Sequence, residues 1–291
     1  MKRQDFRFSF ALRVRWAEVD MQKIVFNAHY LMYFDTAITD YWRALALPYE
    51  ESMKRLGGDL YVKKASLEYL ASARFEDRLT VNLKFVRMGR SSIVFAGAIF
   101  RGDELLVTSE LLYVFADPIT QTSKPAPDVL RQVLEGFEKG QAAYQIKTGG
   151  WGELGVDAAQ IRTEVFVHEQ KIPIEMEWDE ADQTALHAVA YNGLGQVIGT
   201  ARLLEPKPDA SAPGDPVKIG RMAVKSVLRG CGIGHDLLHV LMQSAKQRGH
   251  HSVVLHAQQT ARKFYERAGF LARGDVFCEV DIPHIEMFAT L

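Results

Sequence analysis

The sequence predicts two consecutive α+β domains that differ in how strands and helices follow one another. In the first half, a long apolar helix expected at 27–47 precedes a run of strands, which is typical of an antiparallel meander packed on one helix. In the second half, strands and helices alternate, and a helix expected at 233–247 opens on a cluster of glycines. The change falls in the glycine-rich stretch at 140–150, so we expect domains at 1–140 and 141–291.

The composition excludes several classes of protein. The 35 Lys and Arg residues against 36 Asp and Glu give a formal net charge of -1, without the basic excess of a protein that binds nucleic acid irrespective of sequence. No apolar run approaches the roughly 18 residues of a membrane span, and the first residues include Arg and Asp where a signal peptide is apolar. Cys231 and Cys278 are too few for a disulfide framework, and no Cys/His spacing matches a zinc site. We therefore expect a cytoplasmic protein with reduced thiols, no metal, and no nucleic-acid or membrane partner.

The elements of the first half follow from apolar spacing and from the residues that interrupt it. Alternation predicts a first strand at 6–16, and Pro48 ends the long helix. Prolines between the last strand and the last helix break the regular pattern. In order, the remaining elements are a helical turn at 50–56, strands at 60–69, 78–87, 91–100 and 105–115, and a polar helix at 128–138.

The elements of the second half are punctuated by turns and glycines. Asn192-Gly193 predicts a tight hairpin turn between strands at 186–191 and 196–204. A helix at 158–169 precedes this hairpin, and a loop rich in Pro, Asp and Ala at 205–216 follows it. The remaining expected elements are strands at 217–224 and 252–258 and helices at 233–247 and 260–268, with 143–147 as a candidate first strand.

The first candidate site is a carboxylate that precedes the entry of the long helix. Asp20 follows the first strand and is separated from the helix by a short loop. Amide groups at a helix N-terminus favour an anion and can polarise a carbonyl oxygen as negative charge develops on it. The loop between the first strand and the long helix therefore offers a base or nucleophile beside a site for an oxyanion. The alternative is that it is an ordinary loop that caps the helix. Glu18, which does not lead directly into such a loop, is expected to have a structural role.

The run RWAEVDMQKIVFNAHY at 15–30 resembles the motif of hotdog-fold acyl-CoA thioesterases, in the 4-hydroxybenzoyl-CoA thioesterase and YbgC-like branch. The resemblance implies a hotdog domain with Asp20 as the catalytic carboxylate and a homodimer or tetramer built on that domain. It further implies that oxyanion-binding amides lie near Val25, Phe26 and Asn27, and that Tyr30 lines the substrate pocket. Lys23 stands where the family usually has glycine. The alternative is therefore that the first half has no catalytic activity and instead senses acyl-CoA or forms dimers.

Arg87, Arg90 and Ser91 belong to a turn between two predicted strands. Guanidinium groups match phosphate oxygens in a bidentate fork, so this turn suits the nucleotide end of CoA. A solvated hairpin is the alternative. The turn also resembles the corresponding turn of the hotdog family, which implies a role in binding the cofactor.

The second candidate site is the run RMAVKSVLRGCGIGHD at 221–236, where a strand leads through glycines into a helix. Such a loop can point amides at a pyrophosphate, but it lacks both the P-loop ending and the third glycine of the Rossmann motif. It resembles the R/Q-x-x-G-x-G/A motif of GNAT N-acetyltransferases, which implies a GNAT α/β domain; chemistry dependent on NAD or ATP is the alternative. The resemblance implies that the strand contacts the pantetheine arm of acetyl-CoA and that the loop contacts the pyrophosphate. The residues with these implied cofactor-binding roles are Met222, Ala223, Val224, Arg229, Gly230, Cys231, Gly232, Ile233, Gly234 and His235.

Downstream, the run ARKFYERAGF at 261–270 resembles the last motif of the GNAT family, and further residues resemble its ElaA-like subgroup. The resemblance implies that Tyr265 is the general acid that protonates the departing CoA thiolate, which suits a phenol with a pKa of about 10. A packing aromatic on an amphipathic helix is the alternative. Glu169 is a candidate base for the acceptor amine, and Glu177 and His284 are candidate pocket residues; surface pairing or capping is the alternative for each.

Together these resemblances imply a bifunctional protein that uses CoA thioesters. Water would accept the acyl group in the first domain, and an amine would accept it in the second. Acyl-CoA and acetyl-CoA are the expected co-substrates, and no permanently bound cofactor is expected. The alternative is that one half alone is catalytic and the other senses acyl-CoA or dimerises.

Overall fold

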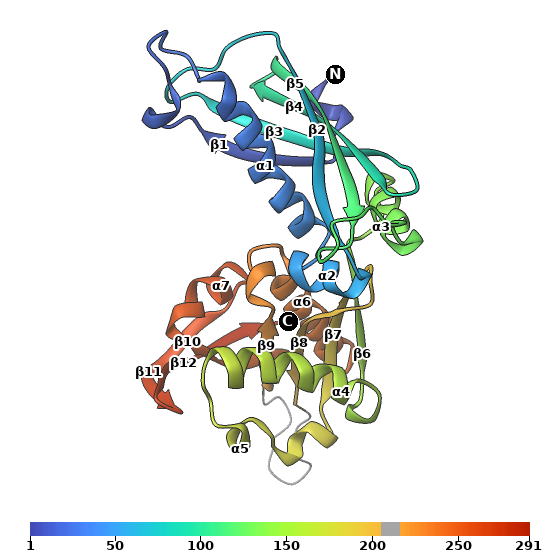
Figure 1. The fold of residues 1–291 in the computed structure, drawn as a ribbon. Coiled ribbons are helices and arrows are strands. Elements are labelled where there is room, and N and C mark those ends of the chain that lie inside the picture. Colours follow the sequence, from blue (N-terminus) through green and yellow to red (C-terminus); the bar gives the residue numbers. More distant parts are fainter. Residues whose placement is uncertain (205–215) are drawn as a thin grey trace. The chain divides into compact units, whose positions relative to one another are not determined.

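The computed structural model describes residues 1–204 and 216–291, which form two compact units, Met1–Ala143 and Tyr144–Leu291 (Figure 1). Almost all of the loop expected at 205–216 lies outside the described residues. Within the described residues, no helix is both long enough and apolar enough to cross a membrane.

The first unit contains an antiparallel five-stranded sheet in the order β1-β3-β4-β5-β2. The predicted meander is confirmed for β3, β4 and β5, whereas β2 pairs with β5 instead of β3. Its strands are β1 (Phe8–Arg13), β2 (Asp59–Tyr69), β3 (Arg78–Met88), β4 (Ser92–Arg101) and β5 (Glu104–Ala116). The three helices are α1 (Asn27–Ala44), α2 (Tyr49–Leu56) and α3 (Asp128–Glu138). In Figure 1, α1 crosses one face of this sheet, which is the arrangement predicted for a hotdog domain.

Helix α1 packs on the sheet through one stripe of side chains spaced three and four residues apart. The buried members of this stripe are Tyr30, Tyr33, Phe34, Ala37, Ile38, Tyr41 and Trp42. Gly97 on β4 allows the close approach, because a Cβ there would lie closer than 3.0 Å to Ser109 Oγ and to the Phe34 ring. The helix ends at Ala44, before the predicted end at 47, because Ala46 is left-handed with φ of 55° and Pro48 disfavours helical backbone at the residue before it.

The second unit contains a seven-stranded sheet in the order β11-β12-β10-β9-β8-β7-β6. Strands β9 and β10 run parallel and all other neighbours are antiparallel. The strands are β6 (Tyr144–Gly149), β7 (Leu186–Asn192), β8 (Val197–Leu203), β9 (Val217–Val224), β10 (Ser252–Gln258), β11 (Leu271–Glu279) and β12 (Ile282–Thr290). Mixed pairing around one parallel pair confirms the predicted α/β character of this half.

Helices α4 (Trp151–Arg162) and α6 (Ile233–Gln247) lie on opposite faces of this sheet (Figure 1). Helix α6 has its predicted bounds, whereas α4 begins seven residues before the predicted start at 158. The early turn was missed because glycine lowers helix propensity, yet Gly155 is needed where the Trp151 ring packs against the helix backbone. Helix α4 continues into a π-helical segment, η3 (Thr163–Glu169), and the short helices α5 (Ile174–Glu177) and α7 (Arg262–Arg267) complete the unit.

We expect Gly97→Ala to lower the free energy of unfolding of the first unit by about 1–3 kcal/mol, because the added methyl group overpacks the contact between α1 and β4. Differential scanning calorimetry of the full chain measures the effect. Gly152→Ala is the matched control, since its Cβ meets nothing within 4 Å and lies in a helix that alanine favours. A loss of equal size in both variants would contradict the close packing of α1 on β4.

Candidate active sites

A cavity of about 450 Å³ opens in the second unit where strands β9 and β10 part. The two strands pair only at Val217 with Val253 and at Lys218 with Val254. Beyond these pairs, residues of both strands line the cavity, including Met222 on β9. The parting of two parallel strands therefore leaves backbone groups of β9 facing a cavity instead of a neighbouring strand.

A β-bulge directs the chain of β9 along this cavity. The register between β8 and β9 shifts between Thr200 and Arg202, and opposite the shift Arg221 adopts a left-handed backbone with φ of 52°. Such a backbone costs free energy at a residue other than glycine and is common near functional sites. Of the strand residues predicted to meet pantetheine, Met222 lines the cavity, whereas the Val224 carbonyl already accepts a hydrogen bond from Arg229 Nε at 3.2 Å.

The glycine loop between β9 and α6 is built to present amides. Gly230 and Gly232 have φ of 86° and 89°, a conformation that glycine adopts without strain. The first amides of α6, from Ile233 to His235, have no partner within the helix, so they can bind an anion. The Cys231 amide does not take part as predicted, because it donates to the Leu228 carbonyl at 3.3 Å.

Glu169 is placed against Arg229 and not in the cavity. Two hydrogen bonds of 2.6 and 2.7 Å join the Arg229 guanidinium to the Glu169 carboxylate. These hydrogen bonds hold the pKa of Glu169 below its usual range, which opposes the predicted role as a base for an amine. The pair also occupies the guanidinium fork of Arg229, so the amides of the loop remain the available donors for a pyrophosphate.

Tyr265 lies on α7 and lines the cavity opposite β9, with its hydroxyl 3.6 Å from Met222 Sδ. Burial raises the pKa of this phenol to about 12. Because the group stays protonated at neutral pH, it can donate a proton to a thiolate in the cavity.

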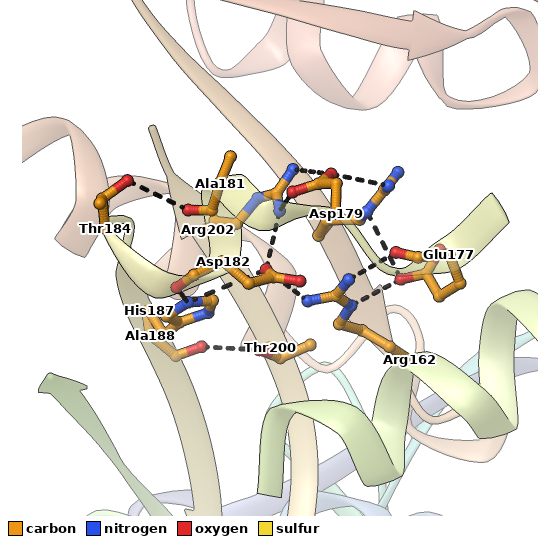
Figure 2. Close-up of polar contacts among 11 residues, drawn as sticks. Arg162, Glu177, Asp179, Ala181, Asp182, Thr184, His187, Ala188, Thr200 and Arg202 are labelled. Atoms are coloured by element: carbon orange, nitrogen blue, oxygen red, sulfur yellow. Dashed lines mark hydrogen bonds and ion pairs between the residues drawn. The ribbon is translucent and has the colours of Figure 1, made fainter. Parts of the chain in front are cut away.

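One wall of the cavity is held by a buried network of charged side chains (Figure 2). Arg162, at the end of α4, is fully buried and binds Glu177 at 2.5 Å and Asp182 at 2.7 Å. Arg202 on β8 also binds Asp182 at 2.7 Å and reaches Asp179 at 2.6 Å. The network links α4 and β8 to the segment that carries α5, and so fixes that segment over the sheet.

Glu177 and His284 both line the cavity, as the sequence predicted for pocket residues, but neither is a free side chain. Burial raises the pKa of Glu177 even though Arg221 and Arg162 oppose this effect. His284 Nδ1 lies 2.7 Å from the Ile282 carbonyl. Glu177 therefore has a structural partner in Arg162, and one ring nitrogen of His284 is already engaged by the backbone.

The sequence analysis missed three residues of this cavity: Lys218 on β9, His256 on β10 and Glu279 on β11. His256 Nδ1 lies 2.5 Å from Glu279 Oε1 and 3.0 Å from Lys218 Nζ. The available signal was a lysine and a histidine within otherwise apolar strands that are expected to be buried.

In the first unit, Asp20 lies at the edge of a hollow that also includes Asn27 and Tyr30. The Asp20 Oδ1 atom accepts the amide hydrogen of Gln22 at 2.8 Å, which fixes the carboxylate within its loop. Tyr30 is buried and its hydroxyl accepts a hydrogen bond from the Ala73 amide at 2.8 Å. The structure thus brings together the predicted carboxylate and two of the predicted pocket residues.

Of the amides predicted near an oxyanion, at Val25, Phe26 and Asn27, the first two are already hydrogen-bonded. The Val25 amide donates to the Ala73 carbonyl and the Phe26 amide to the Glu18 carbonyl, both at 2.9 Å. The next amides, of Asn27 and Ala28, open α1 and have no partner within the helix. They are therefore the donors that can meet a developing oxyanion beside Asp20.

Glu18 anchors this loop, as its expected structural role requires. Its buried carboxylate accepts hydrogen bonds from the Arg15 amide and from the Tyr33 hydroxyl, both at 2.7 Å. Burial alone would raise the pKa of Glu18, but these hydrogen bonds and the Arg15 guanidinium hold it below its usual range.

Lys23, the position where the sequence departs from glycine, has a left-handed backbone with φ of 62°. Its side chain is exposed and is not among the residues that line the hollow. The residue therefore strains the loop backbone without narrowing the hollow.

The turn with Arg87, Arg90 and Ser91 lies at the far end of β3 from Asp20. Strand β3 pairs with β1 so that Arg78 faces Arg13, close to the Asp20 loop, while the turn follows Met88 at the other end. Eleven residues of strand span about 35 Å, so one copy of the first unit does not bring the two groups together. A third arginine missed by the sequence analysis, Arg131 on α3, donates to the Met88 carbonyl at 2.6 Å.

The second unit has the fold and the glycine loop of GNAT acetyltransferases, and the first has the hotdog fold of thioesterases. Residues 152–291 match the acetyltransferase (GNAT) domain family, and residues 22–108 match the thioesterase superfamily. The chain therefore belongs to the GNAT family through its second half, and its first half is similar to the thioesterase superfamily. Both families use CoA thioesters as co-substrates.

Individual relatives resemble one half each. The uncharacterised N-acetyltransferase YjcF of Bacillus subtilis strain 168 is 32% identical over 132 residues, which are 45% of this chain and 89% of YjcF. Protein ElaA of Escherichia coli strain K12 is 32% identical over 133 residues, or 44% of this chain and 82% of ElaA. The acyl-CoA thioester hydrolase YbgC of Escherichia coli O6:H1 is 26% identical over 121 residues, or 41% of this chain and 90% of YbgC.

We expect Lys23→Gly to maintain the free energy of unfolding of the first unit or to raise it by up to about 1 kcal/mol, because glycine adopts the left-handed backbone without strain. Chemical denaturation of the full chain measures the effect. Gln22→Gly is the matched control and should lower the free energy by about 0.5–1 kcal/mol, since it only adds freedom to the unfolded chain. Equal losses in both variants would show that position 23 is not strained.

Proposed function

We propose that the second unit transfers an acetyl or acyl group from CoA to an amine. The observation that carries this proposal is the position of Tyr265 in the cavity between the parted strands β9 and β10. The strand edge with Met222 would hold the pantetheine arm, and the amides that open α6 would hold the pyrophosphate.

In this reaction the amine nitrogen attacks the thioester carbon and the carbon–sulfur bond breaks. The departing CoA thiolate takes the Tyr265 proton, because this phenol remains protonated at neutral pH.

Tyr265→Phe should lower kcat for acetyl transfer by about 100-fold while leaving CoA affinity within about twofold, because the ring remains and only the proton donor is lost. The measurement is CoA release from acetyl-CoA with a panel of primary amines, together with calorimetric CoA binding. The matched control is Tyr191→Phe, which removes a hydroxyl that donates a hydrogen bond to Asp157. Unchanged turnover in Tyr265→Phe would remove this tyrosine from the mechanism.

For the first unit we propose hydrolysis of acyl-CoA thioesters. The supporting observation is the Asp20 carboxylate at the edge of a hollow beside the free first amides of α1. Asp20 would act as nucleophile or as base for water, and the amides of Asn27 and Ala28 would stabilise the oxyanion. The phosphate-binding arginines near Met88 lie too far away within one copy, so we propose that a second copy supplies them in a homodimer or larger oligomer.

Asp20→Asn should reduce amine-independent release of CoA by about 100-fold or more, because the amide can act neither as nucleophile nor as base. Hydrolysis of acyl-CoAs with different chain lengths measures the effect, and Asp40→Asn on α1 is the control. If the wild type releases no CoA above background with any of the thioesters, the first unit is not an esterase. Binding of acyl-CoA without hydrolysis would then favour a sensing role.

A further inference from the structure

Lys218, His256 and Glu279 form a polar cluster on the wall of the cavity that contains Tyr265. The three residues come from separate strands, β9, β10 and β11, and the mechanism proposed above leaves them without a role. The sequence analysis assigned a role to none of them. Their contacts define what the cluster can do.

The distance of 2.5 Å between His256 Nδ1 and Glu279 Oε1 fixes where the imidazole proton lies. A carboxylate is an acceptor, so Nδ1 must carry the hydrogen, and in the neutral ring the lone pair is then on Nε2. Lys218 Nζ lies 3.0 Å from Nδ1 and 3.4 Å from Nε2, so the Lys218 side chain lies against the imidazole ring beside both nitrogens. Glu279 and Lys218 therefore both orient the imidazole.

The neighbouring groups support this assignment. Burial lowers the pKa of Lys218, and Arg202 and Arg221 act in the same direction, although Glu279 opposes them. Burial works against ionisation of Glu279, but the hydrogen bond from His256 and the charge of Lys218 hold its pKa below the usual range. The three groups are therefore electrostatically coupled.

Other charged or titratable side chains around His256 come from the strands and helices packed beside it. Glu286 on β12 faces His256 across the strand pair but is bound by Arg273 at 2.6 Å. Of the other titratable or charged residues of the cavity, His284 is held by a backbone carbonyl and Tyr265 is the proton donor proposed above. Glu177, Asp179 and Arg202 belong to the ionic network already described. Arg221 contacts this network at Asp179, at 3.2 Å, and at Glu177, at 3.5 Å.

A strained turn holds Glu279 in place. The residues that follow it, Val280 and Asp281, have φ of 50° and 58°, and a β-branched residue such as Val280 rarely adopts this backbone. The turn joins β11 to β12, so it sets the position of Glu279 at the cavity. Strain of this kind is common where a side chain must be held for function.

We propose that His256 is the general base for the amine acceptor, with Glu279 and Lys218 as positioning residues; this inference rests on the acyl transfer proposed above. His256 Nε2 takes one proton from the ammonium group of a primary amine. The free amine attacks the thioester carbon, the carbon–nitrogen bond forms and the carbon–sulfur bond breaks. Tyr265 protonates the thiolate and recovers a proton from the new amide nitrogen, and His256 releases its proton to water.

The decisive test is the pH dependence of kcat/KM with acetyl-CoA and the primary amines spermidine, glycinamide and kanamycin as probes. Lys218→Met removes a positive charge beside His256, which stabilises the imidazolium, so the acidic limb of the profile should move to higher pH. Glu279→Gln removes a negative charge and should move the same limb to lower pH. A purely structural role predicts loss of activity without these opposite shifts.

His256→Gln should lower kcat/KM by about 100-fold and remove the acidic limb, whereas the exposed His251→Gln is the matched control and should match the wild type. Nitrogen NMR of the unliganded protein gives a reading that does not need turnover, and should show the hydrogen of His256 on Nδ1. A proton on Nε2 in that spectrum, or a limb that persists in His256→Gln and is lost in His284→Gln, would overturn the inference.

Failure of this inference can be told apart from failure of the proposed function. One outcome would overturn only the role of His256. In that outcome the wild type transfers acetyl groups and Tyr265→Phe is impaired, but the acidic limb of the pH profile does not shift in the Lys218 and Glu279 variants. If the wild type binds CoA but acetylates none of the three amines, both the transfer and the base are overturned.

Discussion

The second unit depends on one buried guanidinium group, that of Arg162. It meets carboxylates from two short helices, α5 and η4 (Glu180–Gln183), and its charge lies over the ring of Trp178 with 4.6 Å between the guanidinium carbon and the ring centroid. Taking these charges out of water is costly, and the cost is offset only because each is paired and hydrogen-bonded. Removing the arginine would leave Asp182 with Arg202 alone and Glu177 with only the more distant Arg221, at 3.5 Å, and breaking a buried ion pair in this way typically costs about 3–5 kcal/mol. The network stabilises the wall of the cavity that contains Glu177 and Asp179, a segment in which the only regular elements are short helices.

The parting of β9 and β10 turns this supported wall into a site. In a continuous parallel pair, the amides and carbonyls of the two strands hydrogen-bond to each other. Here the pairing ends at Lys218 and Val254. The opened space receives Tyr265 from α7 on one side and His256 from β10 on the other. Both residues line one cavity, so in the reaction we propose Tyr265 is the proton donor and His256 the proton acceptor for moving an acyl group from sulfur to nitrogen. In the first unit the same electrophile would meet a simpler site, a carboxylate and the first amides of one helix.

Local patterns in the sequence predicted most of the fold. The stripe on α1, the hairpin at Asn192 and the bounds of α6 all follow from spacing and turn chemistry, which depend on neighbours in the chain. The start of α4 was missed because Gly155 is favoured by a ring packed against it, and that contact is not visible as a helix signal. Among the site residues, motifs located Asp20 and Tyr265 in their cavities. They could not show that the amides of Val25 and Phe26 are already bonded, or that Glu169 pairs with Arg229. Nor could they bring Lys218, His256 and Glu279 together, because that cluster depends on the order of strands in the sheet.

The central claim is that each half of the chain has its own site for a CoA thioester. Isothermal titration calorimetry with a non-hydrolysable acetyl-CoA analogue tests it most directly, using the full chain and the variants Gly232→Val and Arg87→Glu/Arg90→Glu. Gly232→Val disturbs the left-handed backbone of the glycine loop, and the double variant reverses the charge of the turn between β3 and β4. Our account predicts two molecules of analogue per chain in the wild type and one in each variant. A single molecule per chain in the wild type, abolished by one variant and unaffected by the other, would contradict it.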